Sequence, residues 1–318
     1  MSNRIQEILD KNKIVVLDGG IGAELKSRGL DLSGALWSAI ALSEAPEMIE
    51  QLHYEYFSAG ANVGISASYQ ASIEGFERQG FSREQAEELI SRSVTLVKKA
   101  RDRFWNGLSE KEKQDTVYPI IVGSAGPYAA SFADMSEYVG YSPNTSKEDF
   151  ITYHRRRIEL LIEAGAEFIA IETTPSVEEA EAVLEILADF PDIYAWVSFS
   201  STYTNKISNG TPIREAVRRL SGYRRLAAIG INCVDPKLAL PLIKEFAAYS
   251  DKPVIAYPNG KDKYDLSLGT KDFSENARIW FENGAKLIGG CCLTTPNDIR
   301  KISAWARQIL DRQQKLCS

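Results

Sequence analysis

The segment KLIGGCC, residues 286–292, joins a short apolar run to two glycines and then to two adjacent cysteines. A second apolar run, residues 226–231, leads in a similar way into Asn232 and Cys233. Short apolar runs of this length are typical of buried strands, so three of the four cysteines follow predicted strand ends. The fourth, Cys317, lies next to the C-terminus, and its position assigns it no role.

Cys233, Cys291 and Cys292 are candidate ligands of a single metal ion. Adjacent strand residues point to opposite faces, so Cys291 and Cys292 can reach one ion only where the strand has ended. Zinc binds thiolates readily and prefers four ligands, so three cysteines leave one position open, as in catalytic zinc sites. The alternatives are buried apolar cysteines and a redox pair. No C-x-x-C pair occurs, which argues against zinc ribbons and thioredoxin-like chemistry.

Apolar, β-branched runs recur along the chain, and each is followed by a longer segment of helical periodicity. They lie at residues 14–17, 63–67, 118–122, 168–171, 194–199, 226–231, 254–257 and 286–289. Such continuous runs are typical of parallel strands buried on both faces. Eight strand–helix units predict an α/β fold, a (β/α)8 TIM barrel, as one domain over residues 1–318 with its core at about 12–307. An open doubly wound sheet is the alternative, but no G-x-G-x-x-G motif follows the first run.

Several helix starts and loops can also be predicted. Ser82 with Gln85, and Ser176 with Glu179, match the capping-box pattern. A capping residue precedes a proline at the predicted first helical position in Thr211-Pro212, Asp235-Pro236 and Thr295-Pro296. Residues 102–116 predict an exposed helix end and a loop, whereas 200–210 and 259–270 predict longer polar loops after strands.

The composition restricts the classes of function. The chain has 318 residues, 44% of them hydrophobic, and a formal net charge of -6, which argues against a nucleic-acid partner. Residues 1–13 lack the apolar core of a signal peptide, and no apolar stretch reaches membrane-spanning length. Four cysteines do not form a disulfide framework. We therefore expect a soluble, cytoplasmic protein of a reducing compartment, without membrane or nucleic-acid partners, as a monomer or weak dimer.

Six motifs resemble those of the homocysteine S-methyltransferase family. They are Leu17-Asp18-Gly19-Gly20, Leu36-Trp37-Ser38, Ala67-Ser68-Tyr69-Gln70, Ile171-Glu172-Thr173, Gly230-Ile231-Asn232-Cys233 and Gly289-Gly290-Cys291-Cys292. The two cysteine motifs together are the most specific, and the resemblance extends from about residue 12 to about residue 307. It implies a zinc-bearing TIM barrel that methylates homocysteine to methionine. The zinc ligands that it implies are Cys233, Cys291 and Cys292.

The resemblance also implies a substrate site. The predicted substrate-binding residues are Asp18, Trp37, Ser38, Tyr69, Glu172, Thr173 and Asn232. Among them, Glu172 and Asp18 lie, by this resemblance, at the charged end of homocysteine. Trp37, Ser38 and Tyr69 are implied to lie in the pocket.

Several of these residues have a structural alternative. Glu172 ends a buried strand, where a carboxylate needs a partner, either a substrate ammonium or a barrel Arg or Lys. Asp18 either binds substrate or caps the following turn. Trp37 and Tyr69 either face a sulfonium or pack at the rim. Asn232 hydrogen-bonds the site, occupies the open zinc position, or is a turn residue.

Other polar residues are weaker candidates. Residues 123–127 form either a backbone anion pocket or a tight turn. Glu24 is expected on a helix surface. His53 and His154, the only histidines, fall inside predicted helices away from strand ends. No catalytic residue is therefore predicted beyond the zinc site.

The predicted chemistry is thiol methylation at zinc. A free thiol is a poor nucleophile at neutral pH because little of it is thiolate, and an open zinc site can bind the homocysteine sulfur as thiolate. A sulfonium donor leaves as a neutral thioether, so the displacement needs positioning more than acid–base help.

The family divides by methyl donor. Cobalamin-dependent members carry extra domains and betaine-dependent members a C-terminal extension, whereas only residues 293–318 follow Cys292 here. The resemblance therefore favours the compact class, with S-methylmethionine preferred and S-adenosylmethionine possible. The alternatives are another donor such as betaine, or a non-catalytic zinc- or thiol-binding barrel. An aldolase or decarboxylase barrel would need a lysine at a strand end, and none is found at the eight predicted ends.

Overall fold

The computed structural model describes residues 3–34, 36–260 and 272–317, with side-chain burial up to residue 309. Its strands are β1 (Val15–Val16), β2 (Val63–Ile65), β3 (Ile120–Ala125), β4 (Phe168–Thr174), β5 (Tyr194–Phe199), β6 (Leu226–Asn232), β7 (Val254–Tyr257) and β8 (Ala285–Ile288). All pairings are parallel, and the ladder runs from β2 through β8 to β1. The eight strands form a nearly closed barrel, which confirms the predicted (β/α)8 fold.

The two ends of this ladder, β1 and β2, meet at a seam that is closed by single hydrogen bonds. The Asn62 amide donates to the carbonyl of Val16 at 2.7 Å. The Asp18 carboxylate, just after β1, accepts from the amide of Ile65 in β2 at 2.7 Å. Asp18 therefore contributes to closure of the barrel as well as to its interior.

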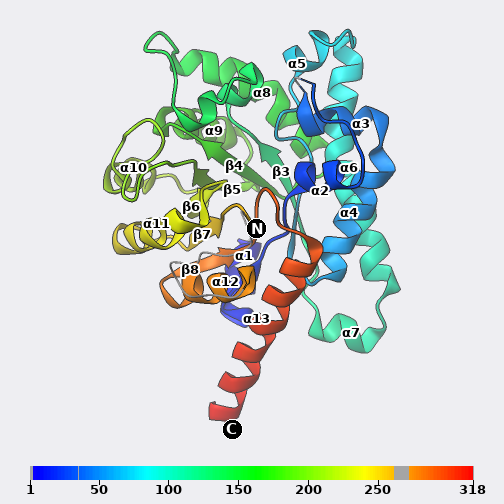
Figure 1. Ribbon diagram of the computed structural model, residues 1–318, viewed down its shortest axis with the longest axis vertical. Coiled ribbons are helices and arrows are strands. Elements are labelled where there is room, and N and C mark those ends of the chain that lie inside the picture. The colour runs from blue at the N-terminus through cyan, green and yellow to red at the C-terminus, as the bar shows by residue number, and fades with distance from the viewer. Residues whose placement is uncertain (1–2, 35, 261–271, 318) are drawn as a thin grey trace.

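Helices surround the strands on all sides (Figure 1). Before β4 they are α1 (Arg4–Asn12), α2 (Ile21–Ser27), η1 (Trp37–Ile40), α3 (Ala41–Glu44), α4 (Pro46–Ser58), α5 (Ile73–Glu77), α6 (Arg83–Gly107), α7 (Glu110–Asp115), η2 (Tyr128–Phe132), η3 (Ser136–Tyr138) and α8 (Lys147–Glu163). After β4 they are α9 (Val177–Ile186), η4 (Leu187–Asp189), α10 (Ile213–Leu220), α11 (Pro236–Tyr249), α12 (Phe273–Glu282) and α13 (Pro296–Cys317). In Figure 1 the end of α13 extends beyond the barrel.

The apolar core has two parts. One lies inside the barrel, where alternate strand residues such as Val122, Trp196 and Leu287 pack together with Ile5 and Ile8 of α1. The other lies between the outer strand faces and the surrounding helices. Because strand residues alternate between faces, each strand contributes to both parts.

Helix α1 covers the amino-terminal end of the barrel. Its Arg4 side chain donates to the carboxylate of Glu167 at 2.9 Å and to the carbonyl of Tyr118 at 2.7 Å, both just before strands. The end covered by α1 is therefore closed. The opposite end, where the strands finish, is left for a binding site, as in TIM barrels generally.

Some predicted boundaries need correction. Strands β3 and β4 extend to Ala125 and Thr174, past the predicted ends at 122 and 171, because their polar residues hydrogen-bond to neighbouring strands. Residues 102–116 contain a second helix, α7, with a capping box at its start. The predicted loop at 259–270 falls mostly outside the described residues.

Some of the predicted helix starts are confirmed, and others need correction. The capping box at Ser82 and the Asp235 and Thr295 starts are confirmed. Pro212 is the capping position and not the first helical residue. Ser176 accepts from the Glu179 amide, but the Glu179 carboxylate turns away to other partners. Among the described residues, no helix is both long and apolar enough to cross a membrane.

Candidate metal centre and active-site cavity

Three thiols converge beyond the ends of β6 and β8. The sulfur atoms of Cys233, Cys291 and Cys292 lie within 4.8 Å of one another, and those of Cys233 and Cys292 are 3.9 Å apart. All three cysteines are free of disulfides. Thiolates bound tetrahedrally to zinc at about 2.3 Å lie about 3.8 Å apart, so this cluster fits one zinc ion.

The cluster already favours negative charge at one sulfur. Hydrogen bonds from Cys233 and Cys291 lower the pKa of the Cys292 thiol to about 4. The pKa of Cys291 is raised. Hydrogen bonding with Cys233 contributes most, followed by hydrogen bonding with Cys292 and by burial. A second and third deprotonation therefore require a neighbouring positive charge, which a metal ion supplies.

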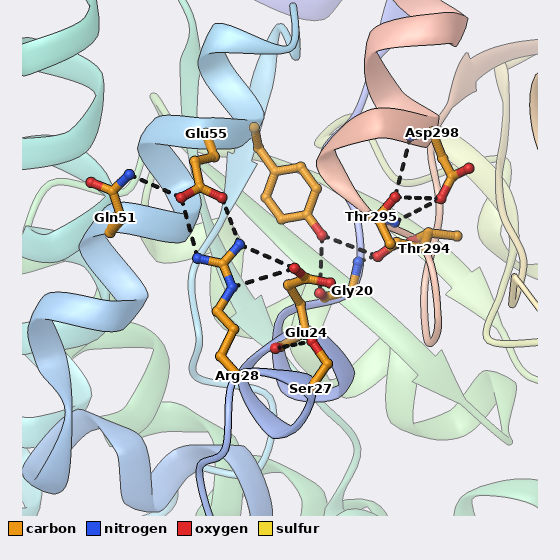
Figure 2. A network of polar contacts seen from close by, with 10 residues as sticks. Gly20, Glu24, Ser27, Arg28, Gln51, Glu55, Thr294, Thr295 and Asp298 are labelled. Carbon is orange, nitrogen blue, oxygen red and sulfur yellow. Dashed lines mark hydrogen bonds and ion pairs between the residues drawn. The ribbon is translucent and has the colours of Figure 1, made fainter.

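The backbone around the cysteines is fixed by residues from distant elements. The Thr294 hydroxyl donates to the carbonyl of Cys291 at 2.6 Å and accepts from the amide of Gly20 at 3.0 Å. The Tyr56 hydroxyl, on α4, donates to the carbonyl of Gly20 at 3.0 Å and lies 3.2 Å from that of Thr294. A Cβ at Gly20 would lie 2.4 Å from the Cys291 carbonyl oxygen, so this approach requires glycine. Figure 2 shows Gly20 and Thr294 side by side in this network.

Glu24 lies in the outer part of the same region. In Figure 2 the guanidinium of Arg28 lies between Glu24 and Glu55, with contacts of 3.1 and 2.5 Å. Gln51 donates to Glu55 at 2.9 Å. The network holds α2 against α4, which gives Glu24 the surface role that the sequence predicts.

A cavity of about 400 Å³ opens beside the thiols. Its lining contains every predicted site residue: Asp18, Trp37, Ser38, Tyr69, Glu172, Thr173, Asn232, Cys233, Cys291 and Cys292. The cavity therefore brings together residues that the sequence spreads over 275 positions, from 18 to 292. This convergence lies at the carboxyl ends of the strands, where TIM-barrel sites form.

Glu172 is held by hydroxyl groups from two other strands, β3 and β7. The Ser124 hydroxyl donates to one carboxylate oxygen, and the Tyr257 hydroxyl donates to the other at 3.0 Å. Burial raises the pKa of Glu172. The alternative of a direct ion pair with a barrel Arg or Lys is not found among the described residues. The carboxylate is oriented by these hydroxyl groups, and the charge of Arg157 lowers its pKa without an ion pair between the two.

Asp18 and Asn232 also have defined partners. Asp18 accepts across the β1–β2 seam from Ile65, so the predicted alternative of a turn cap is wrong. Burial raises the pKa of Asp18 well above its usual value, and the charge of Glu172 raises it further.

Asn232 lies at the end of β6 and is not a turn residue. Its side chain accepts from the Thr173 amide at 2.6 Å and donates to the Thr173 hydroxyl at 2.7 Å. Thr173 has a positive φ of 57°, an uncommon backbone conformation for a β-branched residue. Asn232 therefore stabilises the irregular backbone that presents Glu172.

A buried arginine fixes the loop that carries Tyr69. The Arg157 guanidinium donates to the carbonyls of Ser68, Tyr69 and Gly126 at 2.5–2.7 Å. A Cβ at Gly126 would lie 2.3 Å from the Tyr69 carbonyl oxygen. Residues 123–125 belong to β3, so the predicted anion pocket or tight turn at 123–127 is wrong.

Trp37 and Ser38 enter the cavity from η1. Trp37 has a positive φ of 41°, and its ring lies against Gly22 so closely that a Cβ there would be 2.4 Å away. Ser38 is buried. The two histidines, His53 and His154, are fully buried in α4 and α8 and lie outside the cavity lining.

Several lining residues were missed by the sequence reasoning, and four of them bear on the site. Met135, Glu137 and Tyr138 come from the connection between β3 and α8, and Tyr257 ends β7. The Tyr138 hydroxyl lies 2.9 Å from the Cys233 sulfur. Tyr257 had a usable signal, a polar residue at a predicted strand end. The others lie in an irregular segment without periodicity, so no local signal marks them.

The family model for homocysteine S-methyltransferase matches residues 15–306. The chain belongs to the homocysteine S-methyltransferase family. This confirms the predicted family and, with it, the class of methyltransferase enzymes.

Similar proteins cover the whole barrel. Homocysteine S-methyltransferase YbgG of Bacillus subtilis is 44% identical over 96% of this chain and 99% of its own length. Homocysteine S-methyltransferase of Escherichia coli is 39% identical over 95% of this chain and 98% of its own. The metallated crystal structure of the homocysteine methyltransferase MmuM from Escherichia coli has a TM-score of 0.86 at 39% identity, covering 95% of this chain and 100% of that one.

Proposed function

We propose that this methyltransferase transfers a methyl group from a sulfonium donor to the thiol of L-homocysteine, giving methionine, with zinc held by Cys233, Cys291 and Cys292. The observation that carries the proposal is the convergence of three thiols within 4.8 Å beside a cavity that contains the buried carboxylates of Glu172 and Asp18. The relatives named as homocysteine S-methyltransferases support the acceptor. The metallated form of MmuM supports a metal.

The donor set fits zinc better than a hard cation. Three sulfur ligands suit a soft or borderline metal, and three protein ligands leave a position for a substrate. When bound, zinc supplies stabilisation of a substrate thiolate at neutral pH. The chain itself supplies the fixed geometry, because the Thr294 hydroxyl and the close approach of Gly20 hold the turn at Cys291.

Glu172 and Asp18 are proposed to bind the ammonium group of homocysteine. Both carboxylates are buried, and burial raises the pKa of each. A cation between them would favour their charged forms and compensate the desolvation. Ser124 and Tyr257 orient Glu172 before substrate arrives, which reduces the ordering that binding requires.

The size of the cavity favours a small donor. Its volume of about 400 Å³ is near the lower end of ligand pockets, which run from roughly 300 to 1,000 Å³. Two substrates must share it. We therefore prefer S-methylmethionine, with the bulkier S-adenosylmethionine as a poorer donor.

A donor panel tests this function. Zinc-loaded protein is incubated with homocysteine and methyl-labelled S-methylmethionine, S-adenosylmethionine or betaine, and labelled methionine is followed by mass spectrometry. We expect the highest rate with S-methylmethionine, a lower rate with S-adenosylmethionine and none with betaine. A protein that binds zinc yet gives no labelled methionine from any donor would support the non-catalytic alternative.

We further propose that the chain acts as a single domain, as a monomer or weak dimer in the cytoplasm. The continuous barrel ladder and its two shared core layers support one domain. Light scattering after size-exclusion chromatography measures the oligomeric state, and a stable higher oligomer would contradict the proposal.

A further inference from the structure

The segment of residues 128–141, between β3 and α8, covers one side of the cavity. Ala133, Met135, Glu137 and Tyr138 line the cavity from this segment. Ala133 and Met135 have positive φ values of 54° and 69°. Such conformations cost free energy in residues other than glycine and concentrate at functional sites. We call residues 128–141 the cover segment.

Both ends of the cover segment are fastened to Glu179. Its carboxylate accepts from the Tyr128 amide at 2.6 Å and from the Tyr141 hydroxyl. Thr174 at 3.0 Å and the ring of His154 at 2.8 Å complete its partners. The carboxylate only accepts, so Nε2 of His154 carries the proton that it donates. Glu179 therefore fixes the segment on the barrel.

Within the cover segment, Glu137 holds a buried carboxylate over the cavity. Its backbone carbonyl accepts from the Ser200 hydroxyl at 2.5 Å, which anchors the residue to the end of β5. The residue is 8% exposed, and its Oε2 is buried without a hydrogen-bond partner among the described residues. The next residue, Tyr138, contacts the Cys233 sulfur. Glu137 therefore lines the same cavity as the thiols and has an unused acceptor.

Glu137 differs from the other two carboxylates of the cavity. Glu172 and Asp18 each accept hydrogen bonds from barrel residues. Burial raises the pKa of Glu137, as expected for a desolvated carboxylate. A hydrogen bond from its own backbone amide lowers this pKa, but no cation among the described residues does so. A buried carboxylate without a cation is costly, so a ligand cation would compensate it.

An aromatic ring lies beside this carboxylate. Tyr69 and Glu137 line the same cavity. Burial raises the pKa of Tyr69, and the charge of Glu137 raises it further. Trp37 lines the same cavity. A carboxylate and aromatic faces together bind cations that are too diffuse for hydrogen bonding, as sulfonium ions are.

We propose that Glu137 determines specificity for the cationic methyl donor, by holding its sulfonium group beside the thiol centre. This inference rests on the proposed function, since it assumes a sulfonium donor. In the transfer, the donor S–CH3 bond breaks and its electron pair stays on the donor sulfur, while the homocysteine thiolate forms the new bond. The positive charge beside Glu137 disappears as the donor becomes a neutral thioether.

The loss of charge predicts how Glu137 affects the kinetics. Its attraction is stronger in the bound ground state than in the transition state, where the donor sulfur is already less positive. An interaction of this kind lowers KM for the donor without raising kcat. It also favours release of the neutral product.

The test compares Glu137→Gln with Glu148→Gln, a matched charge removal at an exposed position of α8 outside the cavity lining. Initial rates are measured with each substrate varied while the other is saturating. Losing a charge-assisted contact should raise KM for S-methylmethionine about tenfold or more, with kcat not lowered and KM for homocysteine unchanged. Glu148→Gln should leave all three constants unchanged. An unchanged donor KM in Glu137→Gln, or a raised homocysteine KM instead, would overturn the proposal.

Calorimetry separates this proposal from the proposed function. Zinc-loaded wild type should bind S-methylmethionine more tightly than methionine, its neutral thioether counterpart, and Glu137→Gln should lose that preference. If wild type makes no methionine, the proposed function fails, but this comparison still decides the role of Glu137. A preference retained in the variant would refute it.

Thermal unfolding provides the final check. Glu137→Gln should be at least as stable as wild type, because it removes a desolvated charge. A variant that unfolds would show that the carboxylate is structural and would overturn the proposal. Glu137→Asp, which keeps the charge but withdraws it, should raise the donor KM less than Glu137→Gln does.

Discussion

The strand ends and the cover segment border the same cavity but are built differently. At the strand ends, Glu172 and Asn232 have protein partners for their side chains. In the cover segment, Glu137 keeps a buried oxygen unpaired among the described residues, and Val139 is 73% exposed. The strand ends therefore hold a fixed thiol centre, whereas the segment retains the binding capacity that a ligand must complete.

This difference assigns separate tasks to the two regions. Groups that must keep atomic positions, such as metal ligands, belong on rigid elements. Groups that recognise one substrate and release its product tolerate an irregular loop. We expect substitutions at the strand ends to affect metal binding and KM for homocysteine. Substitutions of the cavity-lining residues in the cover segment should affect KM for the methyl donor.

The largest effect is expected from the cysteines. Cys233→Ser and Cys291→Ser should lose bound zinc and lower kcat on the order of 1,000-fold or more, because an essential ligand is removed. Metal content by mass spectrometry and initial rates measure both effects. Cys317→Ser is the control and should retain metal and rate. Global unfolding of the first two variants would mean that the metal is structural.

Glu172→Gln should weaken the binding of homocysteine. Losing the charge opposite the ammonium group should raise KM for homocysteine roughly 10- to 100-fold, and KM for S-methylmethionine should stay near that of wild type. The pattern is the reverse of that for Glu137→Gln. If Glu172→Gln instead raises KM for the methyl donor, the assignment of homocysteine to the strand ends and of the donor to the cover segment is wrong.

Glu179→Gln tests the fastening of the cover segment. Replacing a buried carboxylate that accepts from Tyr128 and Tyr141 should lower the free energy of unfolding by about 1–3 kcal/mol and speed hydrogen exchange in residues 128–141. Exchange in β4 and β6 should not change. Glu178→Gln, which removes a surface ion pair with Arg219, is the control and should have a much smaller effect.

The smallest effect is expected at His53, which lies in α4 outside the cavity lining. Burial lowers the pKa of His53 in α4 to about 3. Below its unfolded pKa of about 6.5 the unfolded chain takes up a proton that the folded chain does not, so stability falls as pH decreases from about 6.5 toward 3. At pH 5.5 this contribution is about 1.4 kcal/mol.

His53→Leu should therefore reduce the loss of stability between pH 7.5 and pH 5.5, measured by denaturant unfolding. Burial also lowers the pKa of His154. The free energy of unfolding of His53→Leu should therefore still fall somewhat as the pH decreases. If the free energy of unfolding changed equally with pH in wild type and His53→Leu, the neutral state assigned to His53 would be wrong. Catalytic constants at pH 7.5 should not separate the two proteins.

The sequence predicted the strand ends well because their signals are local. The apolar runs locate the strands, and the residues that follow them, such as Cys233 and Glu172, must then meet at one end of a barrel. The cysteine cluster and cavity lining follow from that topology.

The cover segment was not predicted because its structure depends on distant partners. Glu179 matches a capping box with Ser176, yet its carboxylate binds Tyr128 and Tyr141 instead. Asp18 likewise binds Ile65 across the seam rather than its own turn. In both cases a tertiary hydrogen bond replaces the local one that the pattern suggests.

X-ray absorption at the zinc edge measures directly whether the three cysteines hold the metal and leave a position for homocysteine, with zinc-loaded protein measured before and after homocysteine is added. We expect three sulfur ligands and one lighter ligand at first, and four sulfur ligands once homocysteine is present. A first shell with fewer than three sulfurs, or one that homocysteine leaves unchanged, would contradict this expectation.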